Sequence, residues 1–188
     1  MSALVAFECI EDVKAKISVP FCASDNNLRG SGSYIGFAYS EANDAQTLED
    51  FLSAAIVSSA TDACLALAVA AMRHEAGETM DYSHNYSAAA TASTKERAYL
   101  NDFVALMNSR AAELGCTNTL FTSCTGLADG KSRTTAEDIA LIAAAVCSHG
   151  KLYEISDKAS YTLSTGSNQI FTKNALKSDY NLKGYRLE

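Results

Sequence analysis

Residues 47–70 read TLEDFLSAAIVSSATDACLALAVA and form the longest apolar, helix-favouring run in the chain. Leu52, Ile56 and Ser59 recur at spacings of four and three, so they share one face of a helix. After the polar residues in the middle, the run is apolar nearly all round, as in a helix that is buried on several sides. The sequence therefore predicts two consecutive buried helices.

The polar break between the two predicted helices reads SSATD over residues 58–62. Spacing alone favours a capping role, in which Ser59 or Thr61 N-caps the second helix and Asp62 lies in its first turn. The alternative is that Ser59 points into a catalytic cleft, since such a break exposes free backbone groups and a helix N-terminus. Both interpretations fit the residues.

The composition indicates an ordinary globular protein. The chain has 188 residues, of which 48% are hydrophobic and 20% charged, enough for one domain or a large piece of one. Its net charge of -7 argues against binding nucleic acid or an anionic membrane surface. We find no apolar run of membrane-spanning length and no signal peptide.

Both ends of the chain are abrupt. Residues 1–8 already have helical character, with no capping residue ahead of them, and residues 180–188 form no closing element. We therefore expect the natural protein to extend beyond both ends.

The six cysteines show no C-x-x-C pattern and no ligand-like pairing with histidine. Cys64 and Cys147 lie in apolar helical runs and are expected to be buried thiols. Cys116 and Cys124 are close enough in sequence to pair across a loop. The three histidines are expected on the surface; they are His74, His84 and His149.

Helices and loops alternate along the rest of the chain. Residues 14–19 predict a short strand that ends at Pro20, and residues 20–45 predict a polar, Gly/Ser-rich loop. Residues 76–93 are small and polar, which indicates a surface insertion or loop.

The second half of the chain predicts a long amphipathic helix over residues 94–114, ended by Gly115. Its apolar stripe consists of Tyr99, Phe103, Leu106, Met107 and Leu114. Thr134 or Thr135 is expected to cap a further helix that stops before Gly150, with a short helical turn over 151–156. Residues 160–164 and 169–172 alternate as strands do.

Four stretches, in the same order, resemble one known family. They are MSALVAFE (1–8), TLEDFLSAAIVSSATDACLALA (47–68), FVALMNSRAAELGCTNTLF (103–121) and TGLADGKSRTTAEDIALIAAAV (125–146). The chain resembles the serine-type D-alanyl-D-alanine carboxypeptidases, which are low-molecular-mass penicillin-binding proteins related to β-lactamases. The resemblance implies an α+β, β-lactamase/DD-peptidase-like fold, with residues 1–188 forming one partial domain. This domain would contain mainly the helical region and part of the antiparallel sheet. Some apolar helix faces would then be left uncovered, so we expect the chain to be marginally stable.

The chemistry of this family requires three motifs around one cleft. S-x-x-K supplies a serine nucleophile and a lysine that acts as its base. S-x-N supplies a second hydroxyl, which relays a proton to the leaving amine. K-T-G lies on an edge strand, where the lysine attracts the terminal carboxylate of the peptide. Backbone N–H groups stabilise the tetrahedral intermediate, so no metal or organic cofactor is expected.

The resemblance maps the second motif onto Ser59-Ala60-Thr61, so Ser59 is the expected proton relay and Thr61 stands at the family's Asn position. Threonine keeps a hydroxyl but loses the NH2 donor of asparagine. S-x-x-K would precede Met1 and K-T-G would follow Glu188, so the nucleophile and its lysine are absent from this chain. Three by-letter matches lie outside the family context and are read as coincidences: Ser148-His149-Gly150-Lys151, Ser24-Asp25-Asn26 and Ser83-His84-Asn85. Lys183-Gly184 is at most a degenerate third motif.

The family resemblance implies a serine peptidase that removes the terminal D-alanine from peptidoglycan stem peptides through an acyl-enzyme. It also implies that the complete protein binds β-lactams. Its substrate lies outside the cytoplasmic membrane, so the complete protein is expected to be exported. We expect this chain alone to be inactive. Thr61 in place of asparagine favours the alternative, a non-catalytic binding or structural module.

Overall fold

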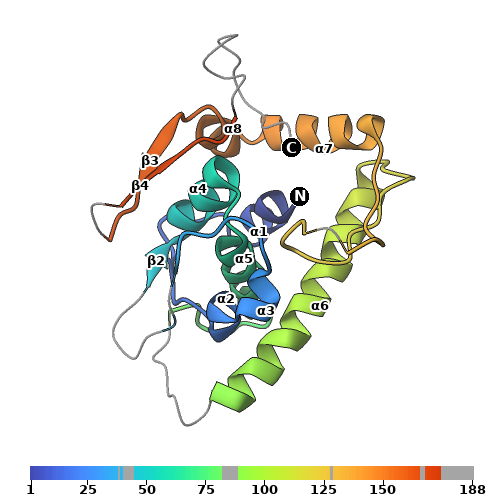
Figure 1. Cartoon of the computed structure of the whole chain (residues 1–188). Helices are drawn as coiled ribbons and strands as arrows, with labels where there is room; N and C mark the ends of the chain where they lie inside the picture. The colour runs from blue at the N-terminus through green and yellow to red at the C-terminus, as the bar shows by residue number, and fades with distance from the viewer. Residues whose placement is uncertain (38, 40–44, 82–88, 128, 166–167, 175–188) are drawn as a thin grey trace.

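The computed structural model describes residues 1–37, 39, 45–81, 89–127, 129–165 and 168–174 (Figure 1). Its architecture is mainly helical with two small antiparallel sheets, which confirms the predicted α+β class. The helices are α1 (Ser2–Ile10), α2 (Phe21–Ser24), α3 (Asn26–Arg29), α4 (Leu48–Ser58), α5 (Thr61–Glu75), α6 (Ala89–Glu113), α7 (Ala136–Ser148) and α8 (Gly150–Ser156). The strands are β1 (Lys16–Ile17), β2 (Gln46–Thr47), β3 (Ser160–Thr162) and β4 (Gln169–Phe171).

Helix α5 lies at the centre of the fold and packs against α1, α2, α4 and α6 (Figure 1). Small side chains allow this crowding, because five alanines of α5 are buried and let neighbouring helices approach closely. Phe51 of α4 and Phe103 of α6 fill the space around it and are fully buried. Residues 47–70 thus form the middle of the core, as their apolar pattern predicted.

Helix α4 begins with Thr47 as its N-cap. The Asp50 N–H donates to Thr47 Oγ1 at 3.1 Å, and the Thr47 N–H donates back to Asp50 Oδ2 at 2.9 Å. This reciprocal pair is a capping box, which satisfies two otherwise free donors of the first turn. Thr135 caps α7 in a similar way, accepting from the Asp138 N–H at 3.2 Å.

The start of α5 differs from the prediction. Its N-cap is Ala60, which makes no side-chain capping bond, so the interpretation that Ser59 or Thr61 caps this helix is wrong. Ser59 instead ends α4 in the left-handed conformation, and only Asp62 lies where it was expected, in the first turn of α5. The reason is that Ala60 takes the N-cap position in the usual extended conformation, and its methyl side chain has no acceptor for a capping bond.

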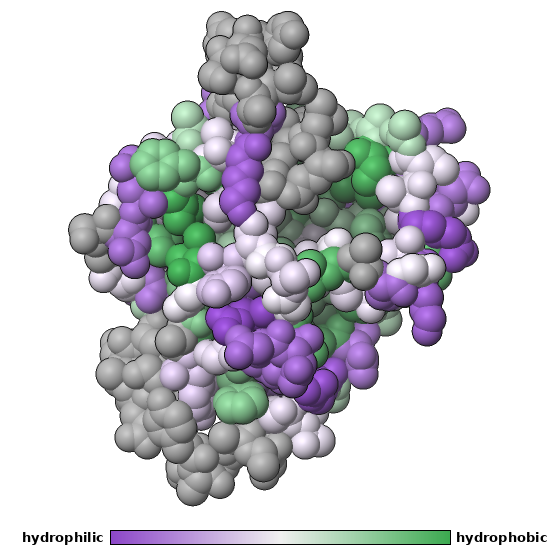
Figure 2. Space-filling model, viewed as in Figure 1, coloured by the Kyte–Doolittle hydropathy of each residue, from purple (hydrophilic) through white to green (hydrophobic). Residues whose placement is uncertain are grey.

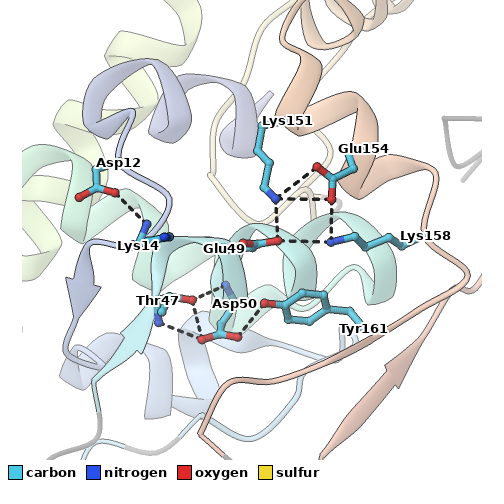
Figure 3. A network of polar contacts seen from close by, with 9 residues as sticks. All are labelled: Asp12, Lys14, Thr47, Glu49, Asp50, Lys151, Glu154, Lys158 and Tyr161. Atoms are coloured by element: carbon cyan, nitrogen blue, oxygen red, sulfur yellow. Dashed lines mark hydrogen bonds and ion pairs between the residues drawn. The ribbon is translucent and has the colours of Figure 1, made fainter.

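The two sheets are short. Strand β1 pairs with β2 with Lys16 opposite Thr47, and β3 pairs with β4 with Ser160 opposite Phe171. Both strands predicted near the end of the chain are confirmed. Asp50 ties this second hairpin to α4, since its carboxylate accepts from Tyr161 Oη at 3.1 Å (Figure 3). It also accepts from the Ser164 N–H at 2.9 Å.

Residues 20–45 are not all loop, because α2 and α3 interrupt them. The Glu96 carboxylate of α6 accepts from the N–H groups of Phe21 and Cys22 at 3.0 and 2.7 Å, so a tertiary contact caps α2. Asp25 caps α3 by accepting from the Asn27 N–H. Helix α6 also begins before the predicted residue 94, at the end of the region expected to be loop. Residues 82–88 of that region lie outside the described residues.

None of the six cysteines forms a disulfide, so the pairing considered for Cys116 and Cys124 is not formed, although both are buried. Cys147 is exposed, which contradicts its predicted burial, and Cys64 is half-buried. His74 is exposed as predicted, and His149 is partly exposed; His84 lies outside the described residues.

Helix α7 explains the exposure of Cys147. Its sequence is largely apolar, yet Ile142 is its only buried apolar residue, while Ile139 and Leu141 are 46% and 38% exposed. The expectation of uncovered apolar helix faces is met here. Within the described part of the chain, no helix has both the length and the apolar character needed to cross a bilayer.

Candidate functional site

Ser59 has the most unusual backbone conformation of the three residues in the predicted second motif. Its backbone has φ 53° and ψ 44°, in the left-handed region that residues with a Cβ seldom adopt. This conformation costs about 1 kcal/mol and persists because α4 and α5 hold both sides of it. Backbone strain of this kind often marks a functional position, so Ser59 is a candidate on geometry as well as on sequence.

Ser59 borders two clefts. The first cleft, of about 270 Å³, lies between α1, α4 and α7 and is mostly apolar, with Ile56 and Ile142 among its walls. The second cleft, of about 260 Å³, lies toward the loop that carries Ser123 and Gly126. Figure 2 shows this face of the molecule hollowed, with apolar surface recessed behind polar residues. Ser59, which is half-buried, therefore lies where the two clefts meet.

The start of α1 lies beside Ser59. Met1 and Ala3 line both clefts together with Ser59, although almost sixty positions separate them in sequence. Ser2 fixes this end of the helix, because its hydroxyl donates to the Cys124 carbonyl at 2.6 Å. The first turn of α1 and Ser59 thus line the same two clefts.

Thr61 does not line either of these clefts. It is only 3% exposed, and its Oγ1 donates to the Ser33 carbonyl at 3.1 Å. Its N–H donates to the same oxygen at 2.7 Å. The structure therefore separates the two predicted site residues: Ser59 faces the clefts and Thr61 is occupied beneath the Gly-rich loop.

Asp62 holds that loop, a role that the sequence did not reveal. The fully buried carboxylate accepts from the N–H groups of Ile35 at 3.2 Å, Gly36 at 2.8 Å and Phe37 at 3.0 Å. A carboxylate that accepts several backbone N–H bonds is a strong anchor. The only signal in the sequence was an acidic residue in a first turn, and this was explained by the helix dipole alone.

Two glycines allow the loop to lie directly on the second motif. A Cβ at Gly32 would lie 2.6 Å from Thr61 Cγ2 and 3.0 Å from Leu127 Cδ2, and one at Gly30 would lie 2.5 Å from Leu127 Cδ1. At 2.5 and 2.6 Å these contacts are closer than a real Cβ makes, so a side chain at either glycine would displace Leu127 or Thr61. The loop therefore joins the second motif to the Gly126-Leu127 segment, two pieces that the family resemblance had singled out separately.

Ser148 and Lys151, which match the letters of S-x-x-K, make only structural contacts among the described residues. Ser148 Oγ donates to the Ala145 carbonyl, and Lys151 Nζ forms ion pairs with Glu49 at 2.9 Å and Glu154 at 3.3 Å (Figure 3). The hydrogen bond to Glu49 raises the pKa of Lys151. A lysine held in its charged form cannot act as a base, so this match carries no nucleophile chemistry.

The other by-letter matches also stay outside the clefts. Ser24 Oγ accepts from the Tyr39 N–H, and Asp25 caps α3. Residues 83–85 and 183–184 lie outside the described residues. Among the residues that the structure describes, no group of three or more His, Cys, Asp or Glu side chains is placed to hold a metal ion.

Comparison with known proteins gives a consistent family. The sequence model of the D-alanyl-D-alanine carboxypeptidase family, Peptidase_S11, matches residues 69–186. No curated protein matches the chain by sequence.

Similar solved structures share the fold. A D-alanyl-D-alanine carboxypeptidase from Mycobacterium tuberculosis has a TM-score of 0.68 at 20% identity, with 95% of this chain and 58% of that one covered. Penicillin-binding protein 6B from Escherichia coli has a TM-score of 0.69 at 20% identity, with 96% and 51% covered. Penicillin-binding protein D2 from Listeria monocytogenes, in its cefotaxime-bound form, has a TM-score of 0.62 at 21% identity, with 93% and 60% covered. The chain thus spans little more than half the length of these proteins.

Proposed function

Because this chain belongs to the D-alanyl-D-alanine carboxypeptidase family, we propose that it forms the second-motif part of a serine peptidase. The complete enzyme would remove the terminal D-alanine from peptidoglycan stem peptides through an acyl-enzyme. The observation that carries the proposal is the position of Ser59, at the junction of two clefts and beside the first turn of α1. There its hydroxyl can relay a proton to the leaving amine.

The position of α1 supports the same reading. A serine and a lysine one helical turn apart, placed just before Met1 as the family motif requires, would emerge next to Ser59. The sequence starts at Met1, so this serine and this lysine are not part of it. Loss of the nucleophile from a serine hydrolase costs roughly a millionfold in turnover, so we propose that this chain alone does not hydrolyse the peptide.

Two measurements on the purified chain test the proposal. In an NMR titration, diacetyl-L-lysyl-D-alanyl-D-alanine should shift the amide signals of Ser59 and of the cleft residues around it. Mass spectrometry after incubation with benzylpenicillin should show no covalent adduct. A stoichiometric adduct would contradict the inactivity, and a peptide that shifts no cleft signal would contradict the proposed site.

A gain-of-function variant tests the role of Ser59 directly. A four-residue extension, Ser-Xaa-Xaa-Lys, placed before Met1 would add about one turn to α1. We expect this variant to acquire slow labelling by penicillin, and the same variant carrying Ser59→Ala to lose it. Equal labelling with and without Ser59→Ala would show that Ser59 has no part in the chemistry.

A non-catalytic binding or structural module is the second candidate, and Thr61 favours it. Its hydroxyl is bonded to Ser33 and it lies outside both clefts, so it does not take over the work of an asparagine amide. Peptide binding without any labelling of the extended variant would support this candidate.

The setting of the complete protein follows from its proposed substrate. Peptidoglycan lies outside the cytoplasmic membrane, so we propose that the complete protein acts there and that β-lactams bind to it. The cefotaxime-bound form of the Listeria protein supports the second point by similarity of fold.

A further inference from the structure

We propose that Cys64 and Cys124 form a redox-sensitive pair, in which thiol–disulfide exchange joins their sulfurs across the second cleft beside Ser59. Cys64 lies near the start of α5, and Cys124 lies in the loop that follows α6. Both residues line the second cleft together with Ser59, and both are thiols in this structure. The inference goes beyond the proposed function, because it assigns a covalent modification that needs no peptide substrate.

The fold brings the two cysteines to one seam although they are far apart in sequence. Gly32 marks the seam, since a Cβ there would lie 2.6 Å from Thr61 Cγ2 and 3.0 Å from Leu127 Cδ2. Cys64 follows Thr61 by three residues and therefore lies on the same face of α5. Cys124 precedes Leu127 by three residues in the loop. The second cleft opens along this seam, where both cysteines line it.

The two thiols differ in access. Cys64 is half-buried, whereas Cys124 is only 4% exposed. Burial raises the pKa of Cys124, and electrostatic repulsion from Cys64 adds to the effect. Since such repulsion fades with distance, the two sulfurs are near neighbours. The raised pKa makes Cys124 a poor thiol for a first attack, so a dissolved disulfide reacts first with Cys64 and Cys124 acts as the resolving thiol.

The exchange balances with oxidised glutathione as the oxidant. Cys64 loses its proton to water, and its sulfur attacks the glutathione disulfide and releases one glutathione thiolate. Cys124 then loses its proton, attacks Cys64 Sγ and displaces the second glutathione thiolate. The two thiolates take up the two protons, so the protein pair is oxidised and one glutathione disulfide is reduced to two thiols. The new bond bridges the opening next to Ser59, which couples this cleft to the redox state of its surroundings.

Cys22 is the competing partner for Cys124. Burial, the Glu96 carboxylate and also Cys124 raise the pKa of Cys22, so it too lies near Cys124. Cys22 is only 1% exposed, however, and it lines neither cleft. Its backbone N–H donates to Glu96 at 2.7 Å, which holds it between α2 and α6. An oxidant that enters the second cleft therefore meets Cys64 and not Cys22.

Mass spectrometry of tryptic peptides tests the pairing. The folded chain is incubated with oxidised glutathione, the remaining thiols are alkylated, and the product is digested. Trypsin places Cys64 in residues 30–73 and Cys124 in residues 111–131. We expect these two peptides to be joined by one disulfide, which a reducing agent breaks. The link should be absent from Cys64→Ser and from Cys124→Ser.

Two variants serve as matched controls. Cys116 shares the second peptide with Cys124, and Cys147 is the exposed cysteine of α7, so Cys116→Ser and Cys147→Ser should both keep the link. In urea the fold no longer selects a pair, and the same link should become one of several. A link between Cys22 and Cys124 in the folded chain would overturn the proposal. So would a lasting mixed disulfide of Cys64 with glutathione, or complete alkylation of both thiols.

Discussion

Replacement of Asp62 by alanine should release the Gly-rich loop from the second motif. The change removes the acceptor of three loop N–H groups, those of Ile35, Gly36 and Phe37. A hydrogen bond to a charged group contributes about 1.5–3 kcal/mol when its loss leaves the partner buried. Only Phe37 is buried, at 7% exposed, while the other two N–H groups belong to half-buried or exposed residues that can reach water. We therefore expect a loss of about 3 kcal/mol rather than the full sum.

Urea unfolding and amide hydrogen exchange together measure this effect. The unfolding free energy of Asp62→Ala should fall by about 3 kcal/mol, and Asp62→Asn, which keeps one acceptor oxygen, should lose about half as much. The amides of Ile35, Gly36 and Phe37 should exchange much faster in Asp62→Ala, while those of α6 change only with global stability. Asp25→Ala is the control, because Asp25 caps only the short α3 and pairs with Arg97 at an exposed site. A loss below about 1 kcal/mol with unchanged exchange would refute the view that Asp62 anchors the loop.

Three further outcomes are expected. Ser59→Gly should be about 1 kcal/mol more stable than Ser59→Ala by thermal or urea unfolding, because only glycine adopts the left-handed conformation without strain; equal stability would argue against it. Burial opposes ionisation of Glu8, but hydrogen bonds from Arg110 outweigh it and lower its pKa below the ordinary 4.5. Since a lowered carboxyl pKa stabilises the folded state above the unfolded-state pKa, the stability advantage of the unchanged chain over Glu8→Gln should be full above pH 5. It should shrink as the pH falls below about 4.5, and an advantage independent of pH between 3 and 6 would contradict the ion pair. The exposed Cys147 should react with a maleimide before the buried Cys124, whose pKa burial raises; equal rates in the folded chain would show that the core opens readily.

Local features were readable from the sequence. The threonine cap of α7, predicted at Thr134 or Thr135 and found at Thr135, and the alternating strands after residue 160 depend on neighbours a few positions away, so their patterns were sufficient. The assignment of Ser59 to the second motif rests on the family resemblance and stays a prediction; the structure adds that Ser59 borders two clefts.

Features built from distant residues were not readable. The capping of α2 depends on Glu96, more than seventy positions away, and no local pattern in residues 20–45 indicates it. The burial of Cys147 was predicted from an apolar run, but Cys147 is exposed because only one face of α7 contacts the rest of the protein. Which face of a helix is covered depends on the whole fold and not on the local sequence.

The break between the two central helices shows the same division within five residues. The sequence by itself determined that two buried helices flank a hydroxyl-rich turn, since hydrophobic periodicity is a local property. Only the tertiary structure decided that Ser59 faces the clefts in a left-handed conformation while Thr61 is sealed against Ser33. The physical reason is that the packing of α4 against α5 sets the conformation of the turn between them. The Gly-rich loop then covers Thr61 and leaves Ser59 uncovered.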